Sequence, residues 1–281
     1  PKDPFSDTDA REPINAAHVW FYGWITALST GIGALPFLCV TTPSGALLGV
    51  SNAIAAGVMI SASASLLLHG LSPTEQLLPL FADGFEYLNW WVSPLQCLVA
   101  LGVGWGFVVT TKRCLEAHDH VELDRIEWDN FRKMVLVVLV MTLHSFSEGV
   151  AIGVSFGGDS ESRLGFFVSL SLAVHNVPEG LAVAIVLLPR GVSKMDSALW
   201  SIFTSLPQAI MAVPAFIGVS HFAPFLPIGL GFAAGAMLNV ALCELVPDAL
   251  SGLGRLDITV STTISAFGVM SLFQFLIRDS L

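Results

Sequence analysis

Two six-residue stretches hold the side chains of this sequence that are best suited to binding a metal ion. HSFSEG at 144–149 and HNVPEG at 175–180 share the pattern H-x-x-x-E-G, and each lies inside a long apolar run. Residues at positions i and i+4 of a helix are neighbours on one face, so each motif places its His beside its Glu. Two imidazoles and two carboxylates suit Zn²⁺ and also accept Fe²⁺, Mn²⁺ or Cd²⁺. The four candidate ligands are His144, Glu148, His175 and Glu179.

The elements that position these ligands are apolar helices in a lipid bilayer. Hydrophobic residues make up 54% of the 281-residue chain and charged residues only 12%, which lies outside the range of soluble globular proteins. Runs of about 20 residues with few or no charges predict an all-α polytopic membrane protein with eight transmembrane helices. The predicted spans are 18–40, 44–69, 93–111, 134–157, 164–188, 197–219, 225–250 and 259–277.

The remaining segments are short. We expect residues 1–17 to form a polar lead and residues 18–281 to form a single transmembrane domain. The longest predicted loops, 70–92 and 112–133, are too short to fold alone. Four cysteines without a C-x-x-C pair are better explained as small packed thiols than as disulfides or a zinc knuckle.

The charged residues predict an orientation for the bundle. Of the 12 Lys and Arg residues, eight fall in the loops after spans one, three, five and seven. Short basic loops stay on the cytosolic side, so both termini should be non-cytosolic, in a plasma or an organellar membrane. The acidic excess lies on the outer face and within the spans, where it would concentrate cations and repel anions. Solvated acidic loops explain the loop residues equally well, and we expect no nucleic-acid partner.

Helix geometry places the four candidate ligands at one depth. The spans 134–157 and 164–188 run in opposite directions, and each His lies roughly 16 Å from one span end and each Glu roughly 14 Å from the other. The first His should be level with the second Glu, and the first Glu with the second His. Single polar residues also join helices in membranes. A doubled ionisable motif near the midplane instead favours a shared metal site.

The residues between and after the ligands predict local backbone features. Pro178 cannot donate a hydrogen bond to the carbonyl of Val174 and should kink its helix. Gly149 and Gly180 leave room for close backbone approach or for hydration. Ser145 and Asn176 follow the two histidines and offer oxygen atoms, as ligands or as partners of the ligands.

On these motifs the sequence resembles the ZIP (Zrt/Irt-like) family of divalent-metal transporters. The resemblance covers residues 18–277, including GFAAGAML at 231–238 and ELVPD at 244–248 on the seventh span. The HSFSEG and HNVPEG variants are similar to those of GufA-like members found in plants and algae. The resemblance implies that the two His and two Glu are primary metal ligands. It also implies uptake of Zn²⁺ toward the cytosol, extracellular termini and often a homodimer, and it suggests an elevator-like movement of helices one, four, five and six against two, three, seven and eight.

Two departures from the family pattern affect a second metal site. Many two-metal members carry Asn where this chain has Ser145, and an acid in the sixth span where TSLPQ at 204–208 offers only Gln208. We therefore hypothesise one strongly held metal ion. Asn176, Gln208 and Ser145 would then form a weak second site or support the ligands.

Other residues are candidates for the ion pathway. His69 ends the second span beside an acidic loop and could receive the ion, although a terminal His is commonly interfacial. Glu244 and Asp248 could guide release, or they could hydrate a helix end. His118 and His120 could sense cytosolic metal, but a solvated loop is the better explanation.

The sequence thus predicts a divalent-metal transporter, not an enzyme, that works by alternating access, passively or with protons. An intramembrane zinc hydrolase is the alternative, yet the chain has no H-E-x-x-H motif and no separate general base. A carrier of organic cations would need aromatic residues around the carboxylates, where only Phe146 stands close. Zinc and iron would use nearly the same ligands.

Overall fold

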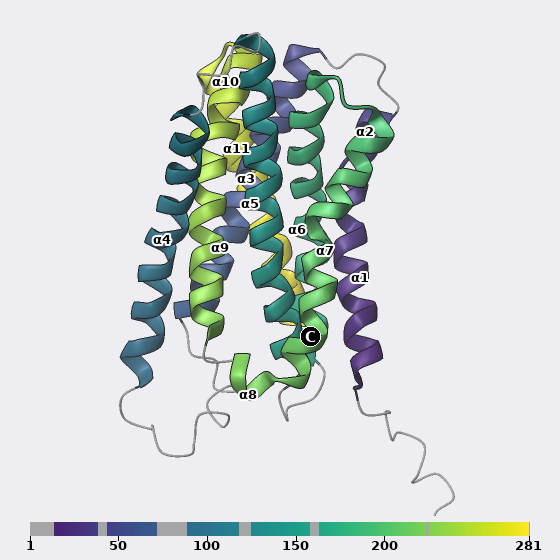
Figure 1. Ribbon diagram of the computed structural model, residues 1–281, viewed down its shortest axis with the longest axis vertical. Helices are drawn as coiled ribbons and strands as arrows, with labels where there is room; N and C mark the ends of the chain where they lie inside the picture. Colours follow the sequence, from purple (N-terminus) through teal and green to yellow (C-terminus); the bar gives the residue numbers. More distant parts are fainter. Residues whose placement is uncertain are drawn as a thin grey trace, which may run out of the picture.

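The fold is a bundle of long helices that run side by side along the long axis of the molecule (Figure 1). A computed structural model describes residues 14–38, 44–71, 89–117, 125–157, 163–222 and 225–280, and all regular segments within these ranges are helical. The α-helices are α1 (Ala16–Ile32), α2 (Leu35–Leu38), α3 (Gly45–Leu71), α4 (Asn89–Ala117), α5 (Arg125–Phe156), α6 (Arg163–Leu187), α7 (Lys194–Ile217), α8 (Val219–Phe222), α9 (Leu226–Val240), α10 (Val246–Leu253) and α11 (Leu256–Ser280). A 3₁₀ turn, η2 (Leu188–Arg190), ends α6, and a π-helical turn, η4 (Ala241–Leu245), joins α9 to α10.

Seven of the described helical stretches are long and apolar enough to cross a membrane. They are Gly45–Leu71, Pro94–Cys114, Met134–Phe156, Gly165–Arg190, Lys194–Ile217, Leu226–Leu253 and Leu256–Ile277. These stretches confirm the prediction of an all-α polytopic membrane protein, with the count of eight spans as an approximation. α1 has 17 residues, slightly fewer than the roughly 20 that a span needs.

The prediction of one continuous helix over 18–40 is wrong. α1 ends at Ile32, residues 33 and 34 form a turn, and α2 follows. A Cβ on Gly33 would overlap the carbonyl of Val177, so the chain turns where it touches α6. Pro36 then has no N–H to continue the hydrogen-bond ladder of α1. Residues 39 and 40 lie outside the described ranges.

The prediction of a long loop over 112–133 is also wrong in the described part. α4 continues to Ala117 and α5 begins at Arg125, while residues 118–124 lie outside the described ranges. The segment contains neither Gly nor Pro. Charged side chains end a membrane span but do not end a helix. The predicted spans 93–111 and 134–157 therefore match the apolar stretches Pro94–Cys114 and Met134–Phe156, while the helices extend beyond them. The expected polar lead over 1–17 likewise overlaps α1, whose first residue is Ala16.

Close backbone contacts divide the bundle into two groups of helices. A Cβ on Gly235 of α9 would overlap the carbonyl of Leu101 in α4, and one on Gly57 of α3 would overlap that of Thr263 in α11. The first group is α1, α2 and α5–α8, and the second group is α3, α4 and α9–α11. Wherever a Cβ added to a described glycine would come within 3.0 Å of another helix, that helix belongs to the same group. A Cβ on Gly229 would meet Ser147 of the other group at a looser 3.6 Å. Small residues at these crossings let helices pack closely in lipid, where burial of apolar surface does not drive association.

A buried apolar core fills the space between the two groups. Met59 of α3 and Met237 of α9 pack with Met141 of α5 and Val183 of α6, and each of the four is at most 1% exposed. Flexible thioethers fill irregular gaps between helices. The core therefore joins the groups through side chains, whereas backbones touch within each group.

The crossing of α4 and α9 generates a prediction about stability. Gly235→Ala should lower the free energy of unfolding by about 1–3 kcal/mol, because the new methyl group overlaps the carbonyl of Leu101. Gly106→Ala in α4 is the matched control, since a Cβ there would meet nothing within 4 Å. We expect thermal melting in detergent to drop for the first variant and to stay level or rise for the second. Equal melting temperatures for the two variants would contradict the assigned crossing.

Candidate metal centre

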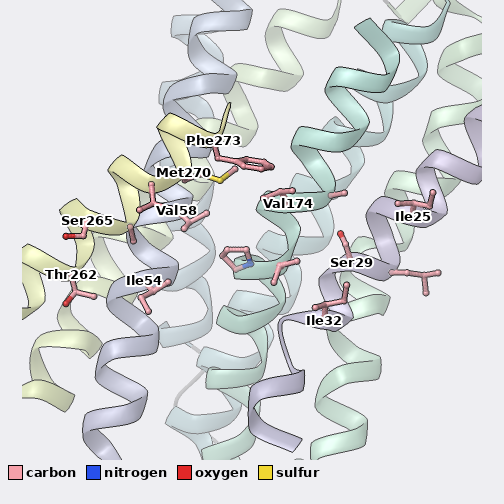
Figure 2. Close-up of a pocket in the computed structure, with 16 residues that line it drawn as sticks. Ile25, Ser29, Ile32, Ile54, Val58, Val174, Thr262, Ser265, Met270 and Phe273 are labelled. Carbon is pink, nitrogen blue, oxygen red and sulfur yellow. The ribbon is translucent and has the colours of Figure 1, made fainter. Parts of the chain in front are cut away.

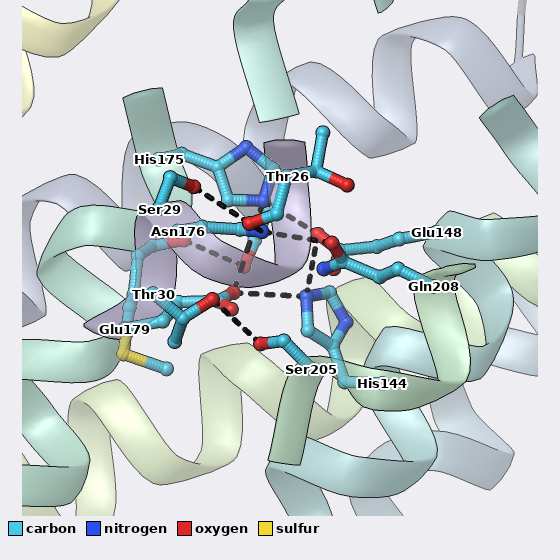
Figure 3. A network of polar contacts seen from close by, with 12 residues as sticks. Thr26, Ser29, Thr30, His144, Glu148, His175, Asn176, Glu179, Ser205 and Gln208 are labelled. Atoms are coloured by element: carbon cyan, nitrogen blue, oxygen red, sulfur yellow. Dashed lines mark hydrogen bonds and ion pairs between the residues drawn. The ribbon is translucent and has the colours of Figure 1, made fainter. Parts of the chain in front are cut away.

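The two motifs converge at one buried cluster between α5 and α6. His144 and Glu148 come from α5, and His175 and Glu179 come from α6. One ligand atom from each of the four lies within 4.8 Å of the others, and none of these residues is more than 3% exposed. Figure 3 shows the four side chains pointing toward one another. Two motifs that are 31 positions apart (144 to 175) thus form a single site.

The contacts within the cluster form both between α5 and α6 and within each of these helices. His175 Nε2 donates a hydrogen bond to Glu148 Oε1 at 2.5 Å, and His144 Nε2 lies 3.0 Å from Glu179 Oε1. These are the two pairs that helix rise places at equal depth. Within each motif, His144 Nε2 lies 3.0 Å from Glu148 Oε1, and His175 Nε2 lies 3.8 Å from Glu179 Oε1.

The cluster fits a divalent cation better than it fits a closed hydrogen-bond network. Neither contact of His144 Nε2 has hydrogen-bond geometry, and Glu179 Oε1 also lacks a hydrogen-bond partner among the described residues. A buried polar atom without a partner costs roughly 1–3 kcal/mol. A divalent cation between the four side chains would satisfy both atoms and offset the charge of the two carboxylates.

Gln208 of α7 supports the cluster as a hydrogen-bond donor. Its side-chain N–H donates to Glu148 Oε2, and its carbonyl oxygen accepts a hydrogen bond from Asn176 Nδ2 at 2.9 Å. Asn176 also donates to the backbone carbonyl of Thr26 in α1 at 2.8 Å. Because a carboxylate at one end and a carbonyl at the other both require donors, the chain of amides can run in only this direction. Gln208 therefore contacts Glu148 directly, and Asn176 holds Gln208 in place.

Two further hydroxyl contacts hold α1 and α7 beside the site. Thr30 and Ser205 share a hydrogen bond of 2.6 Å, and Ser201 donates to the carbonyl of Gly180 at 3.2 Å. Thr30, Ser201 and Ser205 were not among the predicted site residues. The sequence does contain a pattern that could have indicated them. Inside apolar spans it has two polar pairs at positions i and i+4, Thr26 with Thr30 and Ser201 with Ser205.

The glycine that follows each Glu allows a neighbouring helix to approach. A Cβ on Gly180 would overlap the carbonyl of Thr30 in α1, and one on Gly149 would lie 2.7 Å from the carbonyl of Gln208 in α7. Close backbone approach, rather than hydration, therefore explains both glycines. Pro178 lies inside α6, which continues as a helix past it.

The other predicted residues lie apart from the cluster or do not contact it. Ser145 is fully buried, but its hydroxyl has no hydrogen-bond partner in the described part of the chain. His69 is exposed near the end of α3, where its Nδ1 lies 2.7 Å from the carbonyl of Ser65. Glu244 is 7% exposed in the π turn η4 and forms an ion pair of 2.6 Å with Lys112. His118, His120 and the acidic loop after His69 fall outside the described ranges.

Comparisons with known proteins point to one family. Residues 116–274 match the family model described as ZIP zinc transporter. A putative zinc transporter of Arabidopsis thaliana is 39% identical over 260 residues, which cover 92% of this chain and 39% of that protein. The zinc transporter GufA of Myxococcus xanthus is 40% identical over 118 residues, covering 42% of this chain and 46% of that protein. The zinc transporter ZIPB of Bordetella bronchiseptica is 32% identical over 222 residues, covering 78% of this chain and 69% of that protein. The chain thus spans less than half the length of the first two relatives.

The amide chain generates a prediction about metal affinity. Gln208→Leu removes the donor to Glu148 and leaves Asn176 without its acceptor, so we expect zinc to bind about 10- to 100-fold more weakly. Titration calorimetry on the purified protein in detergent measures this change. Gln274→Leu in α11 is the control, because it removes an amide from a membrane span outside the amide chain. Unchanged affinity in Gln208→Leu would show that the amide does not position Glu148.

Proposed function

Because this chain belongs to the ZIP zinc transporter family, we propose that it carries Zn²⁺ across a membrane through the cluster formed by His144, Glu148, His175 and Glu179. The resemblance to this family, with a GufA protein among the relatives, is confirmed. The observation that carries the proposal is the convergence of two imidazoles and two carboxylates within 4.8 Å in a buried position. Fe²⁺, Mn²⁺ and Cd²⁺ would use the same donors.

A transporter accounts for these residues better than a hydrolase does. Three relatives from a plant and two bacteria carry names of zinc transporters. A hydrolytic zinc site needs an open position for water and a general base beside it. Here all four ionisable groups serve as ligands, and Gln208, the next group in contact with Glu148, is an amide that cannot act as a base. Among the described contacts of the cluster, therefore, no separate general base is present for an intramembrane hydrolase.

The proposed mechanism uses proton exchange at the ligands. Metal ligands must be deprotonated, so binding of Zn²⁺ displaces the proton that His175 donates to Glu148. Return of protons to the four side chains would help to release the ion. Each ion exchanges its water shell for two imidazoles and two carboxylates on entry and regains water on exit.

The glycine contacts support alternating access by relative movement of the two helix groups. The four ligands and their amide partner all lie on α5, α6 and α7, within one group. Backbones interlock inside each group, while the groups meet mainly through side chains and the looser contact at Gly229. A movement of the ligand-bearing group would carry the intact site past the other group. This division matches the elevator-like movement that the family resemblance suggests.

The distribution of basic residues supports an orientation of the bundle in the membrane, whereas transport toward the cytosol stays a prediction from the family resemblance. Lys112 lies near the C-terminal end of α4, Arg190 ends η2, and Arg255 lies between α10 and α11. The C-terminal ends of α4 and α10 lie at the same end of the bundle (Figure 1). Under the positive-inside rule that end faces the cytosol and both termini face away from it. The membrane that houses the protein is left open between plasma and organellar membranes. A homodimer stays a prediction from the family resemblance.

The amide chain supports a single strongly held ion. The oxygen of Gln208 accepts a hydrogen bond from Asn176 and, as an amide oxygen, brings no negative charge to a second cation. We therefore expect metal analysis of the purified protein to find one zinc ion per chain at saturation. Two ions bound with comparable affinity would contradict the single-site hypothesis.

Transport itself should depend on each ligand. His144→Ala and Glu179→Gln should each abolish uptake of radioactive zinc into proteoliposomes, because each removes one ligand from a four-ligand site. Gel-filtration profiles matching that of the unmodified protein would show that the variants fold. His221→Ala, on α8 and outside the cluster, is the control and should keep its uptake. Undiminished uptake by either ligand variant would reject the assignment.

A further inference from the structure

An apolar groove with a volume of about 1150 Å³ lies between four helices at the depth of the metal centre. α1 and α6 form one wall and α3 and α11 form the other, as Figure 2 shows. Ile25, Ile32 and Val174 line the first wall, and Ile54, Val58 and Val269 line the second. The walls belong to different helix groups, so the groove opens at the boundary between the groups.

The residues that line the groove are mainly apolar, like the interior of a lipid bilayer. No lining residue is charged, and the hydroxyl of Ser29 is already engaged, since it donates to the carbonyl of Thr26 at 2.6 Å. Water in such a groove would lose hydrogen bonds without gaining partners. An anionic or zwitterionic headgroup would find no ion-pair partner there. An aliphatic chain matches both the lining and the absence of charge.

The groove is continuous with the lipid-facing surface of the spans. Leu28 at its α1 edge is 51% exposed, and Val269 at its α11 edge is 69% exposed. Val269 lies on α11, which is long and apolar enough to cross a membrane, and Leu28 lies on α1, which packs against the spans α6 and α7. The solvent around these helices is acyl chains. A chain can therefore enter from the side without leaving the bilayer.

We propose that this groove binds an acyl chain of a membrane phospholipid. The α6 part of its wall is the outer face of the same helical turns that carry His175 and Glu179. Val174, Val177 and Pro178 line the groove from these turns. The acyl chain thus packs against the turn that holds two of the four ligands. The acyl chain also lies between the two helix groups. A movement of the ligand-bearing group past the other group would therefore have to displace or reshape it. That last consequence rests on the proposed function, whereas binding of the chain does not.

A photo-crosslinking experiment tests the binding. Benzoylphenylalanine is placed at Leu28 in the groove or at Phe21 on the same helix, which is 58% exposed but outside the lining. The full chain is purified through several detergent exchanges, so that only retained lipid remains, and is then irradiated. We expect a phospholipid adduct at Leu28 and none at Phe21. Equal adducts at both positions, adducts with detergent alone, or a crosslink to a second copy of the chain would overturn the proposal.

A second measurement does not depend on the photoreactive residue. Native mass spectrometry counts the phospholipids retained by the unmodified protein, by Ser265→Trp and by Ser261→Trp. Ser265 lines the groove, while Ser261 is an exposed residue of the same helix outside it. We expect Ser265→Trp to lose one retained phospholipid and Ser261→Trp to lose none. The same lipid count in all three proteins would overturn the proposal, and loss of zinc uptake without loss of lipid would bear on the proposed function instead.

Discussion

The carboxylate of Glu148 receives contacts from side chains on three helices, and the arrangement of the bundle around the His/Glu cluster depends on it. His144 reaches it from α5, His175 from α6 and Gln208 from α7. A carboxylate buried in the middle of a membrane span is stable only when several donors or a cation surround it. The need to satisfy this one group therefore brings α5, α6 and α7 together, and Asn176 extends the constraint to α1.

Small residues make this convergence sterically possible. The glycines that follow the two Glu residues let α1 and α7 approach α6 and α5 until backbone meets backbone. In lipid this packing replaces the hydrophobic drive that assembles soluble helices. The same device recurs between α4 and α9 and between α3 and α11, and it produces two internally tight groups. A transporter that moves its site as a unit needs this combination of rigid groups and a softer boundary.

The boundary between the groups is filled in two ways. Methionine and valine side chains form its buried core, and the lateral groove leaves part of it open to the bilayer. Thioethers adapt to shifted neighbours, and acyl chains are fluid. Both fillings would tolerate a relative movement that an interlocked backbone contact would resist. The turn of α6 that carries His175 and Glu179 lines the groove on one face and belongs to the His/Glu cluster on the other.

The sequence by itself determined the features that depend on local pattern. Hydropathy gave the membrane class and most of the spans, and the i, i+4 spacing with helix rise placed the two motifs at equal depth. Hydropathy missed the break near Gly33, and it located the spans but not the helix ends of α4 and α5, because a helix continues past the membrane boundary wherever its hydrogen bonds continue. Only the tertiary structure decided that Gln208 donates to Glu148, that Glu244 pairs with Lys112, and that a groove opens beside α6. Thr26 and Asn176 are 150 positions apart, and the packing of whole helices, not any local preference, brings such residues into contact.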